Sequence, residues 1–177
     1  MDDIVRQAMR KWPNVPACWG WLALDARGDW YMRDEAAQRA GPFAGPDATR
    51  ASKGSRLEHD GLKSFIGRNY QADERGAWYF QNGPQRVHIS LAETPWIVRC
   101  DGQVLSTHTG RPFKAEAVGV DERGLAYVMG ENSIGLIHSM DMLAFSQWLE
   151  LQGSEPEPLC RAELPQRFGF QREPGQP

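Results

Sequence analysis

A tetrapeptide repeated at equal intervals is the feature that most constrains how this chain can fold. "DARG" occupies residues 25–28 and "DERG" occupies residues 73–76 and 121–124, so that successive copies begin 48 residues apart (73 − 25 and 121 − 73). Each copy is followed three residues later by a tyrosine, namely Tyr31, Tyr79 and Tyr127. A period of this length normally marks one supersecondary unit per copy. The spacing therefore predicts a fold with internal structural repeats.

The residues of this tetrapeptide suit a reversal of the chain. Aspartate at the first position of a type I turn accepts a hydrogen bond from the backbone two residues on, and glycine at the fourth adopts the left-handed conformation without a Cβ clash. D-x-R-G is therefore predicted to form a three-residue hairpin loop. Turn chemistry leaves the arginines unexplained. Arg27, Arg75 and Arg123 are either solvated, as loop arginines usually are, or an anion-binding set.

Two helices are predicted from capping signals, one in each half of the chain. Ser55, with Glu58 three residues on, forms the pattern of a capping box and predicts a helix over 57–69. Ser139 is expected to cap a last helix over 139–151. Alternating apolar residues around the turn signals predict strands between them. The expected fold class is therefore α+β, with mostly antiparallel β-hairpins and meanders and one helix per half.

Three further segments complete the expected organisation. A short amphipathic helix opens the chain and ends at Pro13, whereas segment 36–54 is rich in Ala, Gly, Pro and Ser and is predicted to be a long loop. Five prolines interrupt the chain from Glu155 onward and predict an extended tail. The predicted divisions are an N-terminal helix with a hairpin–helix–hairpin repeat, a second meander–helix repeat and a proline-rich tail, at residues 1–93, 94–152 and 153–177.

Composition limits the partners and the compartment. The net charge is −3 and the 20 Lys and Arg residues are spread along the chain, so we expect no nucleic-acid partner. The chain has no uncharged apolar run near 18 residues and opens with two acids, so we expect neither a membrane span nor a secretory signal. The three cysteines lack C-x-x-C spacing, which favours reduced thiols in a cytoplasmic protein.

The segment "STHTGR" is the most reactive-looking stretch of the sequence. It would place His108 as a general base, Ser106 or Thr107 as a hydroxyl group and Arg111 as an anion clamp. No carboxylate that would orient the histidine can be assigned from spacing, and a polar loop between strands is the favoured interpretation. The sequence contains no P-loop, no G-x-G-x-x-G and no G-x-S-x-G.

Histidines and cysteines offer a second possible site. A zinc ion would find donors in His88, His108 and His138, with Cys100 as a fourth ligand, if the fold brought them together. Their spacing is not that of paired metal ligands, and hydrogen-bonded or solvated histidines are the commoner outcome. The sequence therefore predicts neither a metal nor another cofactor.

Aromatic residues are the best candidates for contact with a ligand. Trp19 and Trp21 lie two residues apart, so on a strand they are expected to share one face. Exposed together, they would define a groove for a peptide or a small molecule. Arg39, Arg50 and Lys53 of segment 36–54 could alternatively clamp an anionic ligand, although a solvated loop is the favoured interpretation.

Residues 20–152 resemble an uncharacterised proteobacterial family, known only as a domain of unknown function, that is built from repeated structural motifs. The stretches that carry the resemblance are "LDARGDWYM", "RLEHDGLKSFIGRNYQADERGAWYF", "AETPWIVR" and "AYVMGENSIGLIHSMDMLAFSQWLEL". They correspond to a hairpin, a helix, a meander and a closing strand and helix. The resemblance implies a part in signal transduction and no residue roles. Segment 36–54 and the proline-rich tail depart from the pattern.

Three functions remain open from the sequence. The favoured hypothesis is a non-catalytic regulatory or signalling module that binds a small ligand or a protein, because no reaction motif is present. Its candidate binding residues are the three turn arginines with Trp19 and Trp21. The first alternative is a small hydrolase or metal-dependent enzyme centred on His108, Arg111 and His138. The second is an interaction scaffold that forms a homo-oligomer.

Overall fold

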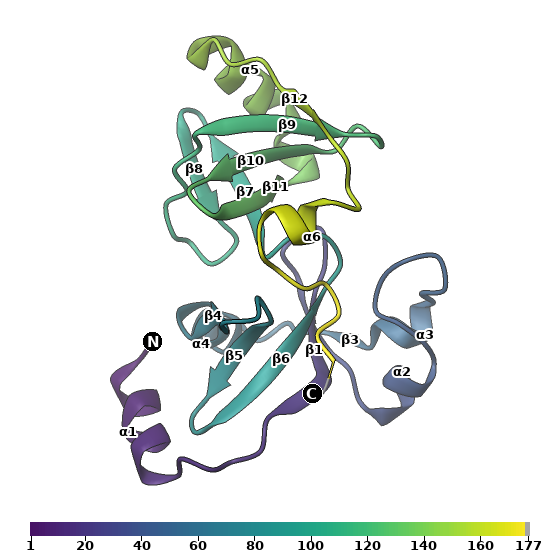
Figure 1. Ribbon diagram of the computed structural model, residues 1–177. Helices are drawn as coiled ribbons and strands as arrows, with labels where there is room; N and C mark the ends of the chain where they lie inside the picture. Colours follow the sequence, from purple (N-terminus) through teal and green to yellow (C-terminus); the bar gives the residue numbers. More distant parts are fainter. Residues whose placement is uncertain (176–177) are drawn as a thin grey trace. The chain divides into compact units, whose positions relative to one another are not determined.

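The computed structural model describes residues 1–175, which form two compact units (Figure 1). Unit 1 comprises Met1–Asp25, Asp29–Ala92 and the segment that begins at Gln171. Unit 2 comprises Ala26–Gly28 and Glu93–Phe170. Within the described range, every helix is too short or too polar to cross a membrane.

Unit 1 is built on a six-stranded sheet in which the central pair is parallel. Its strands, in the order β3-β2-β1-β6-β5-β4, pair antiparallel except for β1 and β6. Their bounds are β1 (Cys18–Leu24), β2 (Trp30–Met32), β3 (Ser55–Arg56), β4 (Tyr70–Ala72), β5 (Trp78–Asn82) and β6 (Gln85–Leu91). The parallel pairing joins segments far apart in sequence, and Leu22 lies opposite Ile89 in its register.

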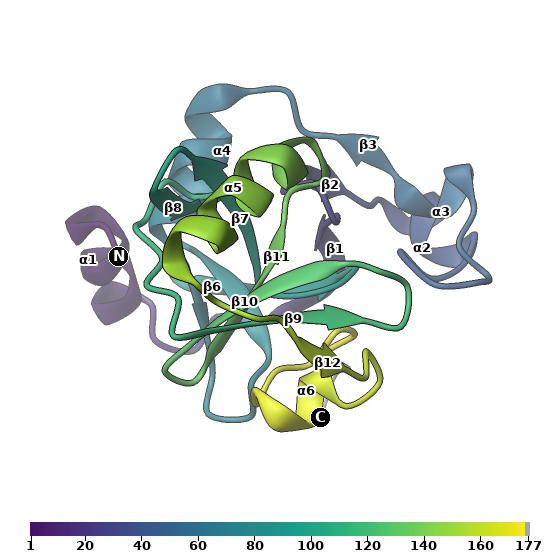
Figure 2. The same ribbon diagram turned by 90° about the horizontal axis from the view of Figure 1, so that it is seen from above.

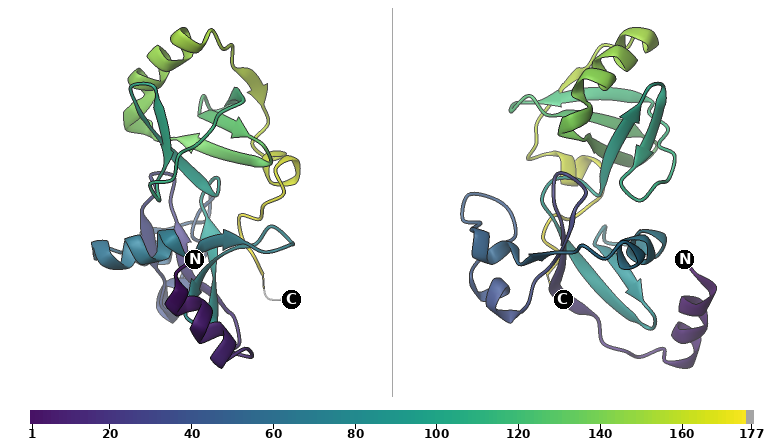
Figure 3. Two further views of the ribbon diagram at one scale, coloured as in Figure 1. Left: turned by 90° about the vertical axis from the view of Figure 1, so that its left-hand side faces the viewer. Right: turned by 180° about the vertical axis from the view of Figure 1, so that it is seen from behind.

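Four helices accompany this sheet: α1 (Asp3–Lys11), α2 (Glu35–Arg39), α3 (Arg50–Lys53) and α4 (Asp60–Arg68). The helix α4 packs on one face, where the rings of Phe65 and Phe80 meet edge to face and Ile66 is buried. Apolar burial of this kind is the main source of helix stability in a small domain. The helices α2 and α3 lie side by side (Figure 3), and β3 follows α3 in the chain.

Unit 2 contains a second six-stranded sheet with the order β12-β9-β10-β11-β7-β8. Its elements are β7 (Trp96–Asp101), β8 (Val104–Thr107), β9 (Ala117–Asp121), β10 (Ala126–Gly130), β11 (Ser133–Ile137), η1 (Ser139–Asp141), α5 (Met142–Gln152), β12 (Glu157–Leu159) and α6 (Leu164–Arg167). The helix α5 lies over the strands of this sheet (Figure 2). Its Phe145 and Trp148 pack with Val98, Val128 and Ile137 in the core of this unit.

The two sheets repeat one arrangement of five strands. The order β2-β1-β6-β5-β4 in unit 1 has the same strand directions as β8-β7-β11-β10-β9 in unit 2. The two DERG turns occupy equivalent positions, between β4 and β5 and between β9 and β10. The DARG turn instead joins β1 to β2, whose counterpart in unit 2 turns at Asp101-Gly102. The predicted α+β fold with internal repeats is confirmed.

The geometry of the tetrapeptides confirms the predicted hairpin turns. Gly28, Gly76 and Gly124 have φ values of 81°, 77° and 79°, which only glycine adopts without strain. The Asp73 carboxylate accepts hydrogen bonds from the backbone N–H groups two and four residues on, both at 2.9 Å. Asp121 does the same in the third copy. Turn chemistry therefore explains the aspartate and the glycine.

The predicted capping residues of the two helices are wrong, and the first helix also begins later than predicted, whereas the second helical segment begins at Ser139 as expected. Ser55 lies in β3 opposite Met32, and α4 begins at Asp60, where Nδ1 of His59 accepts a hydrogen bond from the N–H of Leu62 at 3.0 Å. In unit 2, Nδ1 of His138 accepts from the N–H of Met140, so the histidine takes the capping role predicted for the next residue. An imidazole nitrogen replaces the expected hydroxyl oxygen at both helix starts.

Segment 36–54 is more regular than the predicted loop, because it carries most of α2 and all of α3. The side chain of Asp34 caps α2, and Thr49 with Ser52 forms the capping box of α3. These short polar side chains satisfy backbone N–H groups that water would otherwise have to bind.

The proline-rich tail is also more ordered than predicted. Its strand β12 pairs in parallel with β9 at the sheet edge, where proline is tolerated. Pro165 lies in the first turn of α6, and the side chains of Leu159, Leu164 and Phe170 are buried. Residues 176 and 177 of the predicted tail lie outside the described residues.

Candidate functional site

Two neighbouring pockets of unit 1 share the side chains of Trp21 and Met32. Trp21 lies on β1 and Met32 on β2, and these strands are joined beside them by a hydrogen bond from the N–H of Arg33 to the carbonyl oxygen of Trp21. Both side chains are large and apolar, yet 44% and 52% exposed. Exposed apolar groups that border concave surfaces are typical of interaction sites.

The first pocket, which we call the apolar pocket, has a volume of about 360 Å³. Besides the shared pair, it is lined by Cys18, Leu22, Leu57, Leu62, Ile66, Phe80, Asn82, Gln85 and Val87. These residues come from the sheet and from α4, except Leu57, which lies in the loop between β3 and α4. A cavity of this size with few polar groups is typical of small-molecule sites.

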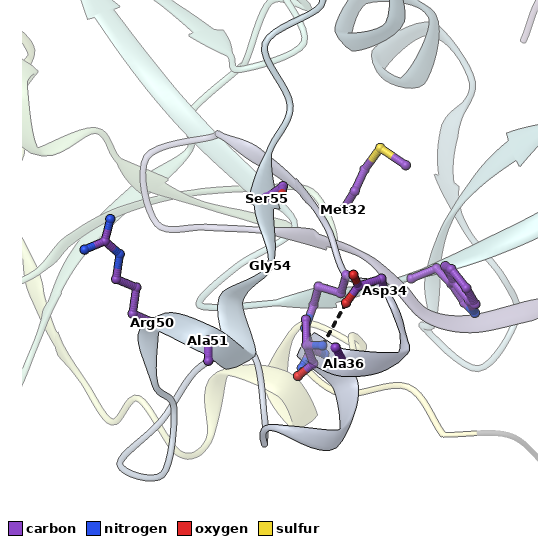
Figure 4. A pocket seen from close by; sticks show the side chains of 10 residues that line it. Met32, Asp34, Ala36, Arg50, Ala51, Gly54 and Ser55 are labelled. Carbon is purple, nitrogen blue, oxygen red and sulfur yellow. Dashed lines mark hydrogen bonds between the residues drawn. The ribbon is translucent and has the colours of Figure 1, made fainter.

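The second pocket, which we call the cationic pocket, has a volume of about 550 Å³. It lies where β2 meets α2 and α3, and its remaining lining is Arg33, Asp34, Ala36, Ala37, Arg50, Ala51, Gly54 and Ser55. Figure 4 shows Arg50 and Ala51 on one side, Asp34 and Ala36 on the other, and Gly54 with Ser55 between them. Arg50, an alternative anion clamp in the sequence, is therefore part of the site.

Arg33 holds the cationic pocket together from below its surface. The residue is only 4% exposed, and its guanidinium donates hydrogen bonds to the carbonyl oxygens of Ser52 at 2.8 Å and Gly41 at 2.6 Å. These bonds tie the ends of α2 and α3 to β2. Burial lowers the pKa of Arg33, and the negative charge of Glu173 opposes that shift. The side chain remains a cation, as arginine does throughout proteins.

The two candidate tryptophans lie apart, contrary to the expectation that they share one face. Trp19 stacks on His88 with ring centroids 3.6 Å apart, whereas Trp21 lines the apolar pocket together with Val87. Neighbouring residues of β6 point to opposite faces, so the two tryptophans do as well. The register of β1 shifts between Cys18 and Leu22, and Gly20 has a φ of 79°. A bulge at this glycine reverses the alternation.

The turn arginines have separate environments. Arg123 of unit 2 binds the Glu93 carboxylate through both terminal nitrogens, at 2.9 and 3.0 Å, and also pairs with Asp121. Arg75 of unit 1 makes a longer pair with Asp73, at 3.7 Å, and is half exposed. Arg27 belongs to the short segment 26–28 that is part of unit 2. None of the three lines the two pockets described above.

Glu93 joins two arginines into a network that fixes the third turn. Nε of Arg161 donates to Glu93 at 2.8 Å, and the hydroxyl of Tyr127 donates to Asp121 at 2.9 Å. Burial favours a raised pKa for Glu93, but the hydrogen bonds from Arg123 and Arg161 outweigh it, so that this pKa is lowered. The arginine of this copy therefore has a structural role.

The residues of the hydrolase hypothesis each serve the fold. His108 is half-buried, and desolvation of its imidazole lowers its pKa to about 3, while its Nδ1 accepts a hydrogen bond from the N–H of Ile97 at 3.3 Å. The Arg111 guanidinium lies over the ring of Trp96, and His138 caps η1. Ser106 is paired with Arg99 in the ladder between β7 and β8. A neutral imidazole engaged with the backbone is a poor general base.

The candidate metal ligands are not gathered into a metal site. His88 belongs to unit 1, whereas His108, His138 and Cys100 belong to unit 2. Across residues 1–175, no three histidine, cysteine or acidic side chains are placed to hold a metal ion. Cys100 is buried, which raises the pKa of its thiol. Its backbone N–H donates to Asp141 instead.

Three residues of the site, Met32, Arg33 and Asp34, were not predicted from the sequence. Met32 follows two aromatic strand residues and resembles an ordinary strand end, and Arg33 resembles a solvated loop arginine. Asp34 offered the available signal, because an aspartate before "EAAQR" is a helix cap. A short helix predicted after Asp34 would have placed Met32 and Arg33 directly before a helix start, where a ligand site can form.

Comparison with known proteins places the chain in a family. It matches the DUF2944 family model, described as "Protein of unknown function (DUF2946)", over residues 1–175 and belongs to that family. The expected resemblance to an uncharacterised family of repeated motifs is confirmed. No curated protein matches the chain.

Two solved structures are similar in fold. A DUF1285 family protein from Silicibacter pomeroyi DSS-3 is 15% identical, with a TM-score of 0.50 and 85% of each chain covered. A DUF1285 family protein from Shewanella baltica OS155 is 13% identical, with a TM-score of 0.45, 76% of this chain covered and 97% of that chain. At these identities the first likeness concerns the fold alone, and the second carries no argument.

Proposed function

We propose that this chain is a non-catalytic binding module of the bacterial cytoplasm that takes a small ligand in unit 1 and acts in regulation or signalling. The observation that carries the proposal is the pair of adjacent pockets that share Trp21 and Met32. Filling the apolar pocket would remove exposed apolar surface from water, which is the main favourable term in ligand binding of this kind. The pockets contain few titratable groups, which favours binding over acid–base chemistry.

The proposed compartment and the proposed regulatory role have support of their own. Cys18, Cys100 and Cys160 are free thiols, a state that suits a reducing compartment. The signalling role follows from the resemblance to a family built from repeated motifs. A module of this kind would respond to its ligand through a change in stability or in association.

A neutral apolar probe tests the proposal. We expect 1-octanol to raise the melting temperature of the full chain, because a ligand that binds only the folded state stabilises it. Trp21→Ala should weaken this binding by roughly tenfold, since it removes one wall of both pockets. Trp12→Ala is the matched control, because Trp12 directly follows α1, is 50% exposed and lines neither pocket. A wild-type protein that 1-octanol does not stabilise would refute the proposal.

A homo-oligomeric interaction scaffold is the second candidate, favoured by an exposed apolar stripe in unit 2. Met140, Leu143 and Leu151 are exposed at helical spacing, whereas Phe145 and Trp148 on the other side are buried. A second copy of this chain is the occupant that would cover the stripe. Light scattering after size exclusion should then give a dimer that Leu143→Glu converts to a monomer. A monomeric wild-type chain would end this alternative.

A further inference from the structure

The two pockets of unit 1 differ in charge, and this difference indicates what kind of ligand would fill both. The lining of the apolar pocket contains no charged side chain. The lining of the cationic pocket contains Arg33, Arg50 and Asp34. Because Trp21 and Met32 border both, a single elongated molecule could lie along them with one end in each pocket.

Within residues 1–175, neither arginine of the cationic pocket forms an ion pair. Arg33 donates its hydrogen bonds to backbone carbonyl oxygens. A buried cation is normally paired with an anion. Glu173 already acts on the charge of Arg33, so Arg50 supplies most of the positive charge that an incoming anion can neutralise.

Asp34 does not cancel this charge at the surface of the pocket. Its carboxylate accepts a hydrogen bond from the N–H of Ala37 at 2.8 Å and so caps the start of α2. That contact directs the negative charge toward the positive end of the helix. Arg50 lies on the opposite side of the pocket (Figure 4) and forms no ion pair within residues 1–175, so its guanidinium remains available to a ligand.

We propose that the ligand of unit 1 is an amphipathic carboxylate, with an unbranched aliphatic chain in the apolar pocket and its carboxylate in the cationic pocket beside Arg33 and Arg50. This inference rests on the proposed function and names the class of its ligand. Guanidinium groups bind carboxylates through strong, charge-assisted hydrogen bonds. The aliphatic chain adds affinity in proportion to the apolar surface that it buries.

Glu173 modulates this recognition from within the chain. The hydroxyl of Ser90 donates to its carboxylate at 2.8 Å, and the negative charge acts on Arg33. A ligand carboxylate beside Arg33 is therefore repelled by Glu173. Glu173→Gln should tighten carboxylate binding by roughly two- to threefold and leave binding of a neutral chain unchanged.

Calorimetric titration of the full chain with octanoate and 1-octanol tests the inference, because the two probes share a chain length and differ in charge. We expect octanoate to bind roughly tenfold more tightly, which corresponds to about 1.4 kcal/mol. Arg50→Gln should remove most of that preference without altering 1-octanol binding. Arg39→Gln should change neither, since Arg39 is an exposed arginine of α2 outside the pocket.

The outcomes separate this inference from the proposed function. If 1-octanol binds as tightly as octanoate or more tightly, the proposal that the ligand carries a carboxylate is wrong. The proposal that unit 1 binds a small ligand would still hold. Octanoate binding that Arg50→Gln does not weaken would overturn the placement of the carboxylate. A chain that binds neither probe would overturn both proposals.

Discussion

The two units of this protein share one arrangement of five strands but differ in the role of the arginine in the DERG turn. In unit 2 the arginine of the DERG turn is bound to Glu93 and Asp121, and Tyr127 is completely buried beside them. In unit 1 the equivalent Arg75 is half exposed and makes a longer ion pair with Asp73, at 3.7 Å. The comparison indicates that the turn needs only its aspartate and glycine, and that the arginine is free to acquire a separate structural role.

The connection that follows the first hairpin of each unit differs as well. In unit 1 the chain between β2 and β4 carries α2, α3, β3 and α4, whereas in unit 2 the chain between β8 and β9 is a short loop. The cationic pocket is lined largely by residues of the longer connection, and α4 lines the apolar pocket. Unit 2 instead places its main helix, α5, after β11. The insertion is thus what gives unit 1 its pockets.

The largest expected effect is a difference in the free energy of unfolding between variants of the two DERG-turn arginines. Arg123→Met should lower the free energy of unfolding by about 2 kcal/mol, because it breaks charge-assisted hydrogen bonds to a mostly buried carboxylate. Arg75→Met should cost less than about 0.5 kcal/mol, as exposed ion pairs contribute little. Urea unfolding followed by circular dichroism measures both. Equal losses of unfolding free energy in the two variants would contradict the different structural roles of Arg75 and Arg123.

A smaller effect on stability is expected from pH, and the difference between the wild type and Glu93→Gln isolates the part that comes from Glu93. The pKa of Glu93 is lowered from its ordinary value of 4.5, so its contribution is fully present above that pH and is lost as the pH falls through the folded-state pKa. The stability difference between the wild type and Glu93→Gln should therefore shrink below about pH 4.5. Urea unfolding between pH 3 and 7 gives this difference, and one that stays constant would contradict the assignment.

The hairpins could be predicted from sequence because their chemistry is local. Each D-x-R-G tetrapeptide contains both the hydrogen-bond acceptor and the glycine that its turn requires. The parallel pairs β1–β6 and β7–β11 could not be predicted, since they join segments with no shared local signal. The helix at Asp60 began later than expected because Ser55 is used by β3 and His59 supplies the cap.

The pockets were harder to predict because they depend on contacts between distant parts of the chain. In the sequence Arg33 resembles a loop residue, because the carbonyl oxygens of Gly41 and Ser52 that accept its hydrogen bonds lie further along the chain. Trp21 was identified as a candidate, but its partner in both pockets is Met32 rather than Trp19. A single bulge at Gly20 decides that outcome, and no local pattern predicts its place.

Methyl chemical-shift mapping with octanoate tests the central claim most directly, because it compares the two units in one experiment. We expect shifts at Leu57, Leu62 and Ile66, which line the apolar pocket. The methyl groups of Val98 and Val118 in the core of unit 2 should remain unchanged. Shifts confined to unit 2, or none at saturating octanoate, would contradict the assignment of the binding site to unit 1.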